Sequence, residues 1–338
     1  MMNCEDLVAQ AQSWVDRKIN KLKELKDRQP LSDIAKPEAI ERLFINKKRS
    51  IFPIPEASIA GLRKEIKLSI EESRPIRLIT PFGCYKPVTL PSPTTANWAE
   101  FIHFSYMAEL AAEIASIHSP GVELVYKLGD IDMDLLADVT DKEVYWYFQT
   151  FSKLANRFRD WVPANVSFQV SKLSDYISKE NFRQATEVEI DRLRPIWEKD
   201  RDSSRIMTVC DRTKRNNTNV FLSDGDVFEK ALRSAAMIVV DTRYLCEKKA
   251  INLIYRTITE VIAQSNLDKT IFPFRSCSGC LVQFWVGEGG LVWNGKKVYP
   301  VIFGQNSVRE ASILHAIDSY EFRECGPNFN QLTIYSKC

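Results

Sequence analysis

The chain has 338 residues, of which 45% are hydrophobic and 27% charged, so it is long enough for one large α/β domain or two smaller ones. Its net charge of +2 gives no overall field that would favour nucleic acid or a membrane surface. The N-terminus is polar, no apolar run reaches the length of a spanning helix, and the eight cysteines are widely spread. We therefore expect a cytoplasmic, reduced protein without membrane contact. Its oligomeric state is not defined by the sequence.

The N-terminal part of the chain predicts helices. Residues 1–30 carry an apolar stripe at helical spacing, residues 30–55 form a broken region, and Ala57–Ile70 predicts a short helix. We expect residues 1–70 to form a helical segment packed on the core, and residues 71–338 to form a single α/β domain.

A strand, a helix and a second strand follow, and the rest of the chain is organised around them. Arg77–Thr80 and Val122–Leu128 are apolar runs that predict strands, and Trp98–His118 repeats apolar residues at helical spacing. In α/β sheets, ligands bind outside the carboxyl ends of the strands. Lys86 follows the first strand and Asp130 follows the second. Both residues are therefore expected where catalytic and ligand-binding residues of α/β proteins usually lie.

The middle of the chain predicts more elements of the same kind. Its helices are expected at Asp141–Phe158, Asp226–Val240 and Ala250–Ile262, with a charged and mostly helical stretch at Lys172–Lys199 and a strand at Val166–Val170.

The last third of the chain predicts a β-meander. Its strands are expected at Leu281–Val286, Leu291–Trp293 and Lys297–Phe303, with a glycine-rich turn at Gly287–Gly290 and a hairpin turn at Asn294-Gly295. The fold class is therefore α/β, with a Rossmann-like central sheet, flanking helices, a helical N-terminal segment and a C-terminal β-meander.

Two candidate residues lie between the first strand and the following helix. Prolines on both sides of Lys86 stiffen its loop, so that the amine could hold a phosphate or carboxylate, or form an imine. A plain surface lysine is the alternative. Glu100 fits a capping box with Asn97, and it could also face the site from the start of the helix.

Asp130 and Asp132 belong to an acidic cluster that follows a strand. A solvated loop is one interpretation of this cluster. A pair of aspartates could also hold Mg²⁺ against a phosphate, as in nucleotidyltransferases, although their upstream Gly-Ser element is absent. A third possibility is a carboxylate that holds a substrate amine or hydroxyl.

Basic residues could hold the anionic groups of a substrate. Arg212 and Lys214 belong to the most basic segment, which also fits a flexible loop, and Arg275 follows a strand-like run. A non-catalytic protein that binds nucleic acid through Arg201–Arg215 remains an alternative. The Cys277–Cys280 pair and the three histidines are not assigned to a metal or redox site.

The order of these features resembles the isocyanide (isonitrile) synthase family, also called the pyoverdine/dityrosine biosynthesis family. Its members show a strand leading to a Pro-x-x-x-Lys loop, an Ala-Glu at a helix start, a Pro-Gly strand ending in an Asp loop, and a later Thr-Pro-Trp-His-like segment. The matching residues here are Pro81 to Lys86, Leu90-Pro91, Ala99-Glu100, Pro120-Gly121, Asp130, Val139 to Tyr147, and Phe272 to Ser276.

The sequence also departs from the family pattern. Where the family has Ser-Asp-Gly, this chain has Gly129-Asp130-Ile131, and the family's histidine is Arg275 here. The Lys-Ser-Pro-Asn of the family is shortened to Lys86-Pro87.

The resemblance implies a transferase or lyase of secondary metabolism that needs no cofactor and no metal. Such an enzyme condenses the amine of an amino acid with the ketone of ribulose 5-phosphate and fragments the adduct to an isonitrile. The implied catalytic residues are Lys86, Glu100 and Asp130, and the implied substrate-binding residues are Arg212, Lys214, Arg275 and Asp132. A Mg²⁺-dependent nucleotidyl or phosphoryl transferase using Asp130 and Asp132 is the alternative enzyme, and a non-catalytic binding protein is the other alternative.

Overall fold

The computed structural model describes residues 16–17, 19–27, 37–45, 54–82, 98–131, 140–216, 223–254, 269–273, 289–293 and 298–302. Its centre is a five-stranded parallel sheet in the order β3-β2-β1-β4-β5. The strands are β1 (Ile76–Phe82), β2 (Val122–Leu128), β3 (Val166–Lys172), β4 (Ile251–Ile254) and β5 (Thr270–Pro273).

The strand order contains one topological switch point. The chain adds β2 and then β3 on one side of β1, and returns to add β4 and β5 on the other side. In open α/β sheets a crevice forms outside the carboxyl ends of the strands at such a reversal, here between β1 and β4. The α/β class with a Rossmann-like sheet is therefore confirmed.

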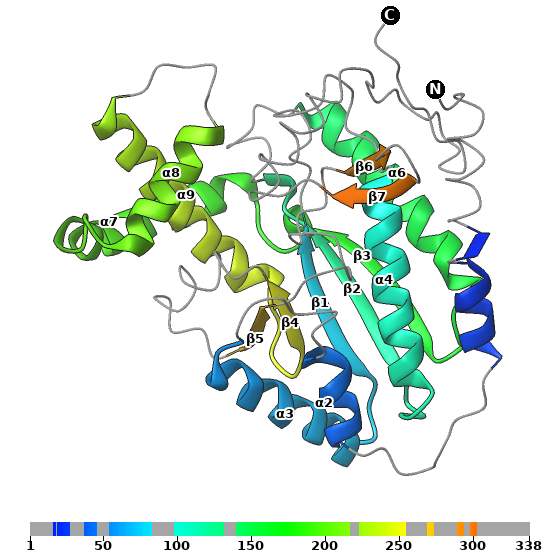
Figure 1. Cartoon of the computed structure of the whole chain (residues 1–338). Coiled ribbons are helices and arrows are strands. Elements are labelled where there is room, and N and C mark those ends of the chain that lie inside the picture. Colours follow the sequence, from blue (N-terminus) through cyan, green and yellow to red (C-terminus); the bar gives the residue numbers. More distant parts are fainter. Residues whose placement is uncertain are drawn as a thin grey trace, which may run out of the picture.

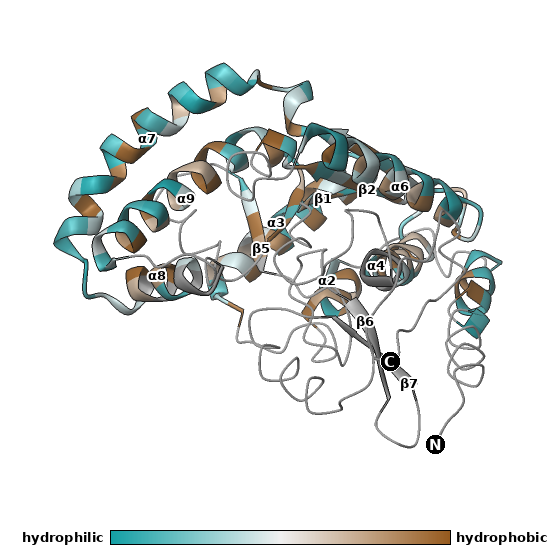
Figure 2. Ribbon diagram, turned by 90° about the horizontal axis from the view of Figure 1, so that it is seen from above, coloured by the Kyte–Doolittle hydropathy of each residue, from teal (hydrophilic) through white to brown (hydrophobic). Residues whose placement is uncertain are grey.

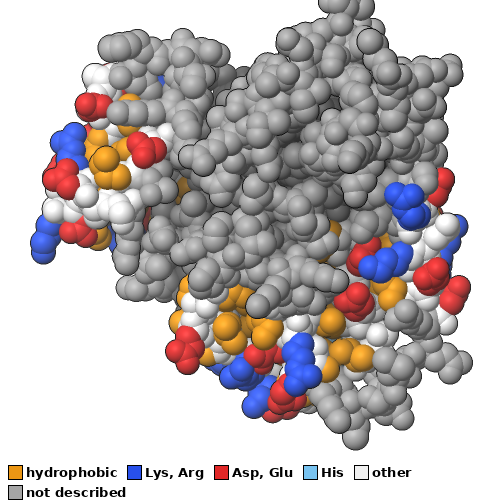
Figure 3. Space-filling view, in the orientation of Figure 1, with side chains coloured by type: hydrophobic (Ala, Val, Ile, Leu, Met, Phe, Trp, Pro, Cys, Tyr) orange, Lys and Arg blue, Asp and Glu red, His pale blue; other side chains and the backbone are white. Residues whose placement is uncertain are grey.

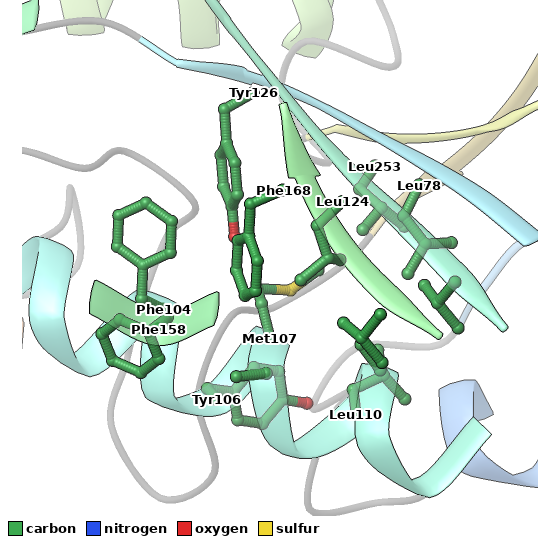
Figure 4. Close-up of a cluster of buried hydrophobic side chains, with 14 of the residues drawn as sticks. Leu78, Phe104, Tyr106, Met107, Leu110, Leu124, Tyr126, Phe158, Phe168 and Leu253 are labelled. Atoms are coloured by element: carbon green, nitrogen blue, oxygen red, sulfur yellow. The ribbon is translucent and has the colours of Figure 1, made fainter. Parts of the chain in front are cut away.

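One face of the sheet packs against helices α4 (Trp98–Ala115) and α6 (Asp141–Arg159), as Figure 1 shows. Side chains alternate between the two faces of a strand, so Leu124 and Tyr126 lie on the α4 side and Lys127 lies on the other. Figure 4 shows Tyr126 and Phe168 from the sheet facing Phe104 and Met107 from α4. Burial of these large apolar groups is the main stabilising term for this layer.

The N-terminal helices share this core. Helix α2 (Pro37–Ile45) and helix α3 (Glu56–Glu71) bury Ile40, Phe44 and Leu62 in the same cluster as the strands. The ring of Phe44 lies edge-on to Phe272 of β5, with 5.8 Å between their centroids.

Helices α7 (Lys179–Lys199), α8 (Ser204–Asn216) and α9 (Asp224–Leu245) form an arm beside the sheet, as Figures 1 and 2 show. The arm has its own apolar cluster, which includes Leu193, Trp197, Ile206 and Phe228. Figure 3 shows acidic and basic side chains interspersed over the described surface of one face. Within the described residues, no helix is both long enough and apolar enough to cross a membrane.

Side-chain caps fix where the long helices begin. Thr140 and Glu143 form a capping box at the start of α6, and Ser223 and Asp226 form another at the start of α9. In each box the hydroxyl accepts a backbone N–H of the first turn while the carboxylate accepts the N–H of the capping residue. The Asn97 cap proposed for α4 lies outside the described residues.

Four expectations from the sequence are wrong. The segment Ala250–Ile262 was expected to be helical, but it begins with β4, because a short, fully buried strand has no periodicity that separates it from a helix. The broken region 30–55 contains α2, which starts at Pro37, a residue that fits the first turn of a helix.

The other two corrections concern the basic segment and the glycine-rich turn. The basic segment, also interpreted as a loop, forms α8, because Ile206, Val209, Cys210 and Thr213 recur at helical spacing toward the arm's interior. Gly289 and Gly290 are the first residues of strand β6 (Gly289–Trp293) rather than part of a turn.

The C-terminal hairpin is confirmed for its last two strands. Strand β6 pairs with β7 (Val298–Ile302) in an antiparallel sheet of its own. The expected strand Leu281–Val286 and the Asn294-Gly295 turn lie outside the described residues.

Candidate functional site

The segments that carry three of the predicted site residues all leave the same edge of the sheet. Asp130 follows the carboxyl end of β2, Lys86 lies in the segment after β1, and Arg275 lies in the segment after β5. The strands are parallel, so their carboxyl ends lie along one edge. The described strand ends from which these segments start therefore lie at the kind of edge where α/β proteins bind ligands.

Hydrogen bonds across the strand ends hold Asp130 in place. The backbone N–H of Gly129 donates to the carbonyl oxygen of Phe82 at 2.8 Å, which ties the exit of β2 to that of β1. The backbone N–H of Ser174 donates to Oδ1 of Asp130 at 3.0 Å, which ties the same exit to the 3₁₀ turn after β3. Asp130 is therefore fixed between the ends of three adjacent strands.

An apolar anchor supports this short segment. Ile131 is buried in a cluster with Leu173 and Ile177, next to the Asp130–Ser174 contact. In the described part of the chain, Oδ2 of Asp130 has no hydrogen-bond partner. The half-buried carboxylate thus has one oxygen used for positioning and one that could meet a ligand.

The other predicted residues are placed less completely. Glu100 lies in the first turn of α4, the helix that follows β1, and its side chain is not described. Arg212 and Lys214 lie on α8, within the arm rather than on a loop at the sheet. Lys86, Asp132 and Arg275 lie outside the described residues.

A buried charge cluster on the opposite face of the sheet was missed by the sequence reasoning. Lys127 of β2 is fully buried, and its Nζ lies 2.8 Å from Oε1 of Glu247, just past the end of α9. Arg77 of β1 donates to Glu247 from Nε at 2.7 Å and also pairs with Glu123. Nζ of Lys127 also lies 4.4 Å from the centroid of the Tyr176 ring.

This cluster holds Glu247 ionised. Burial raises the pKa of Glu247, but its hydrogen bonds to Arg77 and Lys127 outweigh that effect, and the net pKa lies below its ordinary value. The cluster fastens the end of α9 to two central strands, so its role is structural. The signal was available in the sequence, since Glu123 and Lys127 occupy one face of an otherwise apolar strand.

The described residues do not assemble a metal centre. They contain no group of three or more His, Cys, Asp or Glu side chains that could hold a metal ion. Asp130 is the described member of the predicted acidic pair, and its Oδ1 already accepts a backbone N–H.

Comparisons with known proteins give a likeness in fold. No protein-family model matches the chain, and no curated protein matches it. The structure is similar to that of the PvcA protein from Pseudomonas aeruginosa, with a TM-score of 0.53 and 16% identity over 95% of this chain and 99% of that one. The chain therefore has a distant fold relationship with PvcA along nearly the whole length of both proteins.

Weaker likenesses involve two other kinds of protein. One is tyrosyl-tRNA synthetase from Pyrococcus horikoshii, with a TM-score of 0.39 and 14% identity over 79% of this chain and 60% of that one. The other is a CDPS from Fluoribacter dumoffii, with a TM-score of 0.33 and 9% identity over 62% of this chain and 94% of that one.

Proposed function

We propose that this protein is an isocyanide-synthase-like enzyme, which joins the amine of an amino acid to the ketone of a sugar phosphate such as ribulose 5-phosphate. The observation that carries the proposal is the bond from the Gly129 N–H to the Phe82 carbonyl at 2.8 Å. It fixes side by side the two strand ends from which the Lys86 and Asp130 segments leave. The order of motifs that resembles this enzyme family runs through the same two strand ends.

The reaction needs groups that move protons at one centre. The substrate nitrogen bonds to the ketone carbon, and the ketone oxygen leaves as water. Both carbon–carbon bonds of that carbon then break, one leaving its electron pair on the ketone carbon and releasing an aldehyde, the other leaving its pair on the departing fragment, which takes up a proton. The ketone carbon stays on the nitrogen, and no external oxidant or reductant is needed. Oδ2 of Asp130 suits a proton acceptor, because the Ser174 N–H fixes the carboxylate through its other oxygen. We assign Glu100 as the second acid or base and Lys86 as the partner of the carbonyl or phosphate.

The substrates also carry two anionic groups, a phosphate and a carboxylate. Arg275 follows β5 closely, so its guanidinium is the candidate nearest in sequence to the sheet edge. Arg212 and Lys214 of α8 are further candidates, and Asp132 could hold the substrate amine. Arginine suits both anions because its planar group binds them with two parallel hydrogen bonds.

The proposal is tested by incubating the full chain with ribulose 5-phosphate and each of the twenty amino acids, with mass spectrometry as the readout. We expect one amino acid to be consumed and replaced by a product one carbon heavier and two hydrogens lighter. Omission of ribulose 5-phosphate is the control and should prevent consumption. If all twenty amino acids stay intact, the proposed function is wrong.

A further inference from the structure

A tyrosine on the surface folds back over the end of strand β3. Tyr176 directly follows the 3₁₀ turn Leu173–Asp175, and its backbone N–H donates to the carbonyl oxygen of Leu173 at 2.9 Å. Its phenol oxygen lies 3.0 Å from Oγ of Ser171, which belongs to β3. The side chain therefore spans the turn and fastens the end of the turn to the strand from which the turn leaves.

The ring of Tyr176 also contacts a buried charge. Nζ of Lys127 lies 4.4 Å from the ring centroid, a distance at which an ammonium group is attracted to an aromatic face. Lys127 and Ser171 are register partners on β2 and β3, so this one tyrosine contacts two adjacent strands. The Lys127 ammonium is a fixed partner, because its side chain is buried and it lies 2.8 Å from Oε1 of Glu247.

The same turn supplies the hydrogen bond that orients Asp130. Ser174 is the middle residue of the turn, and its backbone N–H donates to Oδ1 of Asp130 at 3.0 Å. A donor that keeps its place fixes the direction of the other carboxylate oxygen, whereas a donor that moves lets the carboxylate rotate. The turn is held at its beginning by the buried side chain of Leu173 and at its end by Tyr176. The direction of the Asp130 carboxylate thus depends on both contacts.

We propose that Tyr176 is a positioning residue for Asp130, which acts through the turn that lies between them. The inference deepens the proposed function and rests on it, since Asp130 is the proposed acid–base group of that reaction. The structural role of the buried charge cluster thereby extends to the candidate site, because Lys127 holds the ring of Tyr176. The variant Tyr176→Leu loses both the ring contact and the phenol contact, whereas Tyr176→Phe keeps the ring contact alone.

The first test needs no substrate and measures amide hydrogen exchange at Ser174 in the full chain. We expect the exchange rate to rise about tenfold in Tyr176→Leu and about threefold in Tyr176→Phe, because a turn with weaker contacts opens more often. Tyr176 is 46% exposed, so neither substitution disturbs the core. An unchanged exchange rate at Ser174 in Tyr176→Leu would overturn the positioning role.

A second tyrosine on the surface provides the matched control. Tyr145 of α6 is 57% exposed, and its ring contacts that of Trp146 at 5.9 Å between centroids. The variant Tyr145→Leu should leave the exchange rate at Ser174 at the wild-type value. An equal rise in both leucine variants would mean that loss of any exposed tyrosine loosens the turn, which would also overturn the positioning role.

The second test separates positioning of Asp130 from general stabilisation. Tyr176→Leu should lower kcat about tenfold while KM for ribulose 5-phosphate stays within about twofold, because Asp130 is proposed to move protons rather than to hold the substrate. In the Asp130→Asn background the same substitution should have no further effect on kcat, since the group that it positions is already inactive. A kcat that falls equally in both backgrounds, or that keeps its wild-type value in Tyr176→Leu, would contradict the inference.

The failure of this inference can be told apart from the failure of the proposed function. If the wild-type protein consumes no amino acid, the proposed function is wrong, and the exchange rate at Ser174 still decides whether Tyr176 holds the turn that binds Asp130. If the wild type is active and the exchange rate at Ser174 does not respond to Tyr176→Leu, the proposed function stands and the positioning role is overturned.

Discussion

The carboxylate of Asp130 accepts the backbone N–H of Ser174 at 3.0 Å, across the ends of the adjacent strands β2 and β3. One oxygen of the carboxylate is thus committed to holding two strand ends together. The anchoring role and the proposed acid–base role therefore reside on different oxygens, and substitutions can separate them.

Asp130→Asn keeps an oxygen that can accept the Ser174 N–H but cannot take up a proton at neutral pH. We expect its free energy of unfolding to stay within about 0.5 kcal/mol of the wild-type value, while turnover falls by about 10²-fold or more. Asp130→Ala should lose turnover and about 1 kcal/mol of stability as well. Urea denaturation and steady-state turnover measure the two effects.

A neighbouring carboxylate provides the control for this pair. Asp175 lies in the same turn, accepts the backbone N–H of Lys172 at 2.8 Å and is exposed. Asp175→Asn should therefore retain full turnover. Wild-type turnover in Asp130→Asn would remove Asp130 from the acid–base role.

Glu247 should make stability depend on pH in the acidic range. Hydrogen bonds from Arg77 and Lys127 hold its pKa below the ordinary value despite burial, so its contribution is complete above the ordinary pKa. The stabilising contribution of Glu247 is lost as the pH falls through the lowered pKa. We expect Glu247→Gln to lower the free energy of unfolding by roughly 2–3 kcal/mol at pH 7. The difference in this free energy between the variant and the wild type should become smaller below about pH 4.

The comparison variant for Glu247 is Glu187→Gln, which disrupts an exposed ion pair with Arg233. Exposed pairs contribute about 0–1 kcal/mol, so little change is expected at any pH. Urea midpoints from pH 3 to pH 7 provide the data. A pH-independent difference for Glu247→Gln would contradict this account.

His103 should also make the free energy of unfolding fall as the pH is lowered, and it should do so at higher pH than Glu247. Its pKa falls from 6.5 to about 3 because it is buried, so the unfolded chain takes up a proton below pH 6.5 while the folded chain does not. Stability is then lost as the pH falls from 6.5 toward 3. Between pH 6.5 and 4.5 the free energy of unfolding should fall by about 2–3 kcal/mol because of His103. The His103→Gln variant should not show this part of the loss.

His118 is the control for His103. Its pKa is also lowered by burial, but it is less deeply enclosed and its Nε2 lies 2.9 Å from the carbonyl oxygen of Arg74. His118→Gln should change the pH profile less than His103→Gln does. An NMR titration in which His103 protonates near pH 6.5 would contradict a lowered pKa caused by its burial.

Gly121 should not tolerate a side chain. Its φ is +83°, and a Cβ would lie 1.8 Å from the carbonyl oxygen of Asn165, which accepts the Val122 N–H at 2.9 Å. We expect Gly121→Ala to lower the free energy of unfolding by at least about 2 kcal/mol, since both the backbone and the β2–β3 contact must shift.

Gly225 is the matched glycine for this test. It lies in the first turn of α9, where a Cβ would meet only Ser223 Oγ at 3.8 Å. Gly225→Ala should be neutral or slightly stabilising by urea denaturation. Equal stability of the two alanine variants would contradict the close approach at Gly121.

The central sheet was predictable where its strands have clear boundaries. β1 and β2 are apolar runs followed by Gly83 and Gly129, and α4 between them has helical periodicity. β4 was not predictable, because four buried residues carry no period, and its identity comes from pairing with β1 and β5. In α8 the helical spacing of Ile206, Val209 and Thr213 was present in the sequence, but the face on which they pack against α9 is seen only in the structure.

The candidate site was predictable in outline only. The rule that ligands bind at the carboxyl ends of parallel strands placed Asp130 correctly at the sheet edge. Its contact with Ser174 was beyond sequence reasoning, because it joins residues from two different strand exits. For the Lys127–Glu247 pair, the sequence does show charged residues on one face of an apolar strand, but the partner of Lys127 is identified only once α9 is placed.

The most direct test of the account is an isotope experiment with ribulose 5-phosphate labelled with ¹³C at its ketone carbon. The full chain is incubated with this sugar phosphate and the amino acid that it consumes, and the product is analysed by mass spectrometry and ¹³C NMR. The account predicts a product that carries the labelled carbon bonded to the substrate nitrogen. A product without the label, or an amino acid that is never consumed, would contradict it.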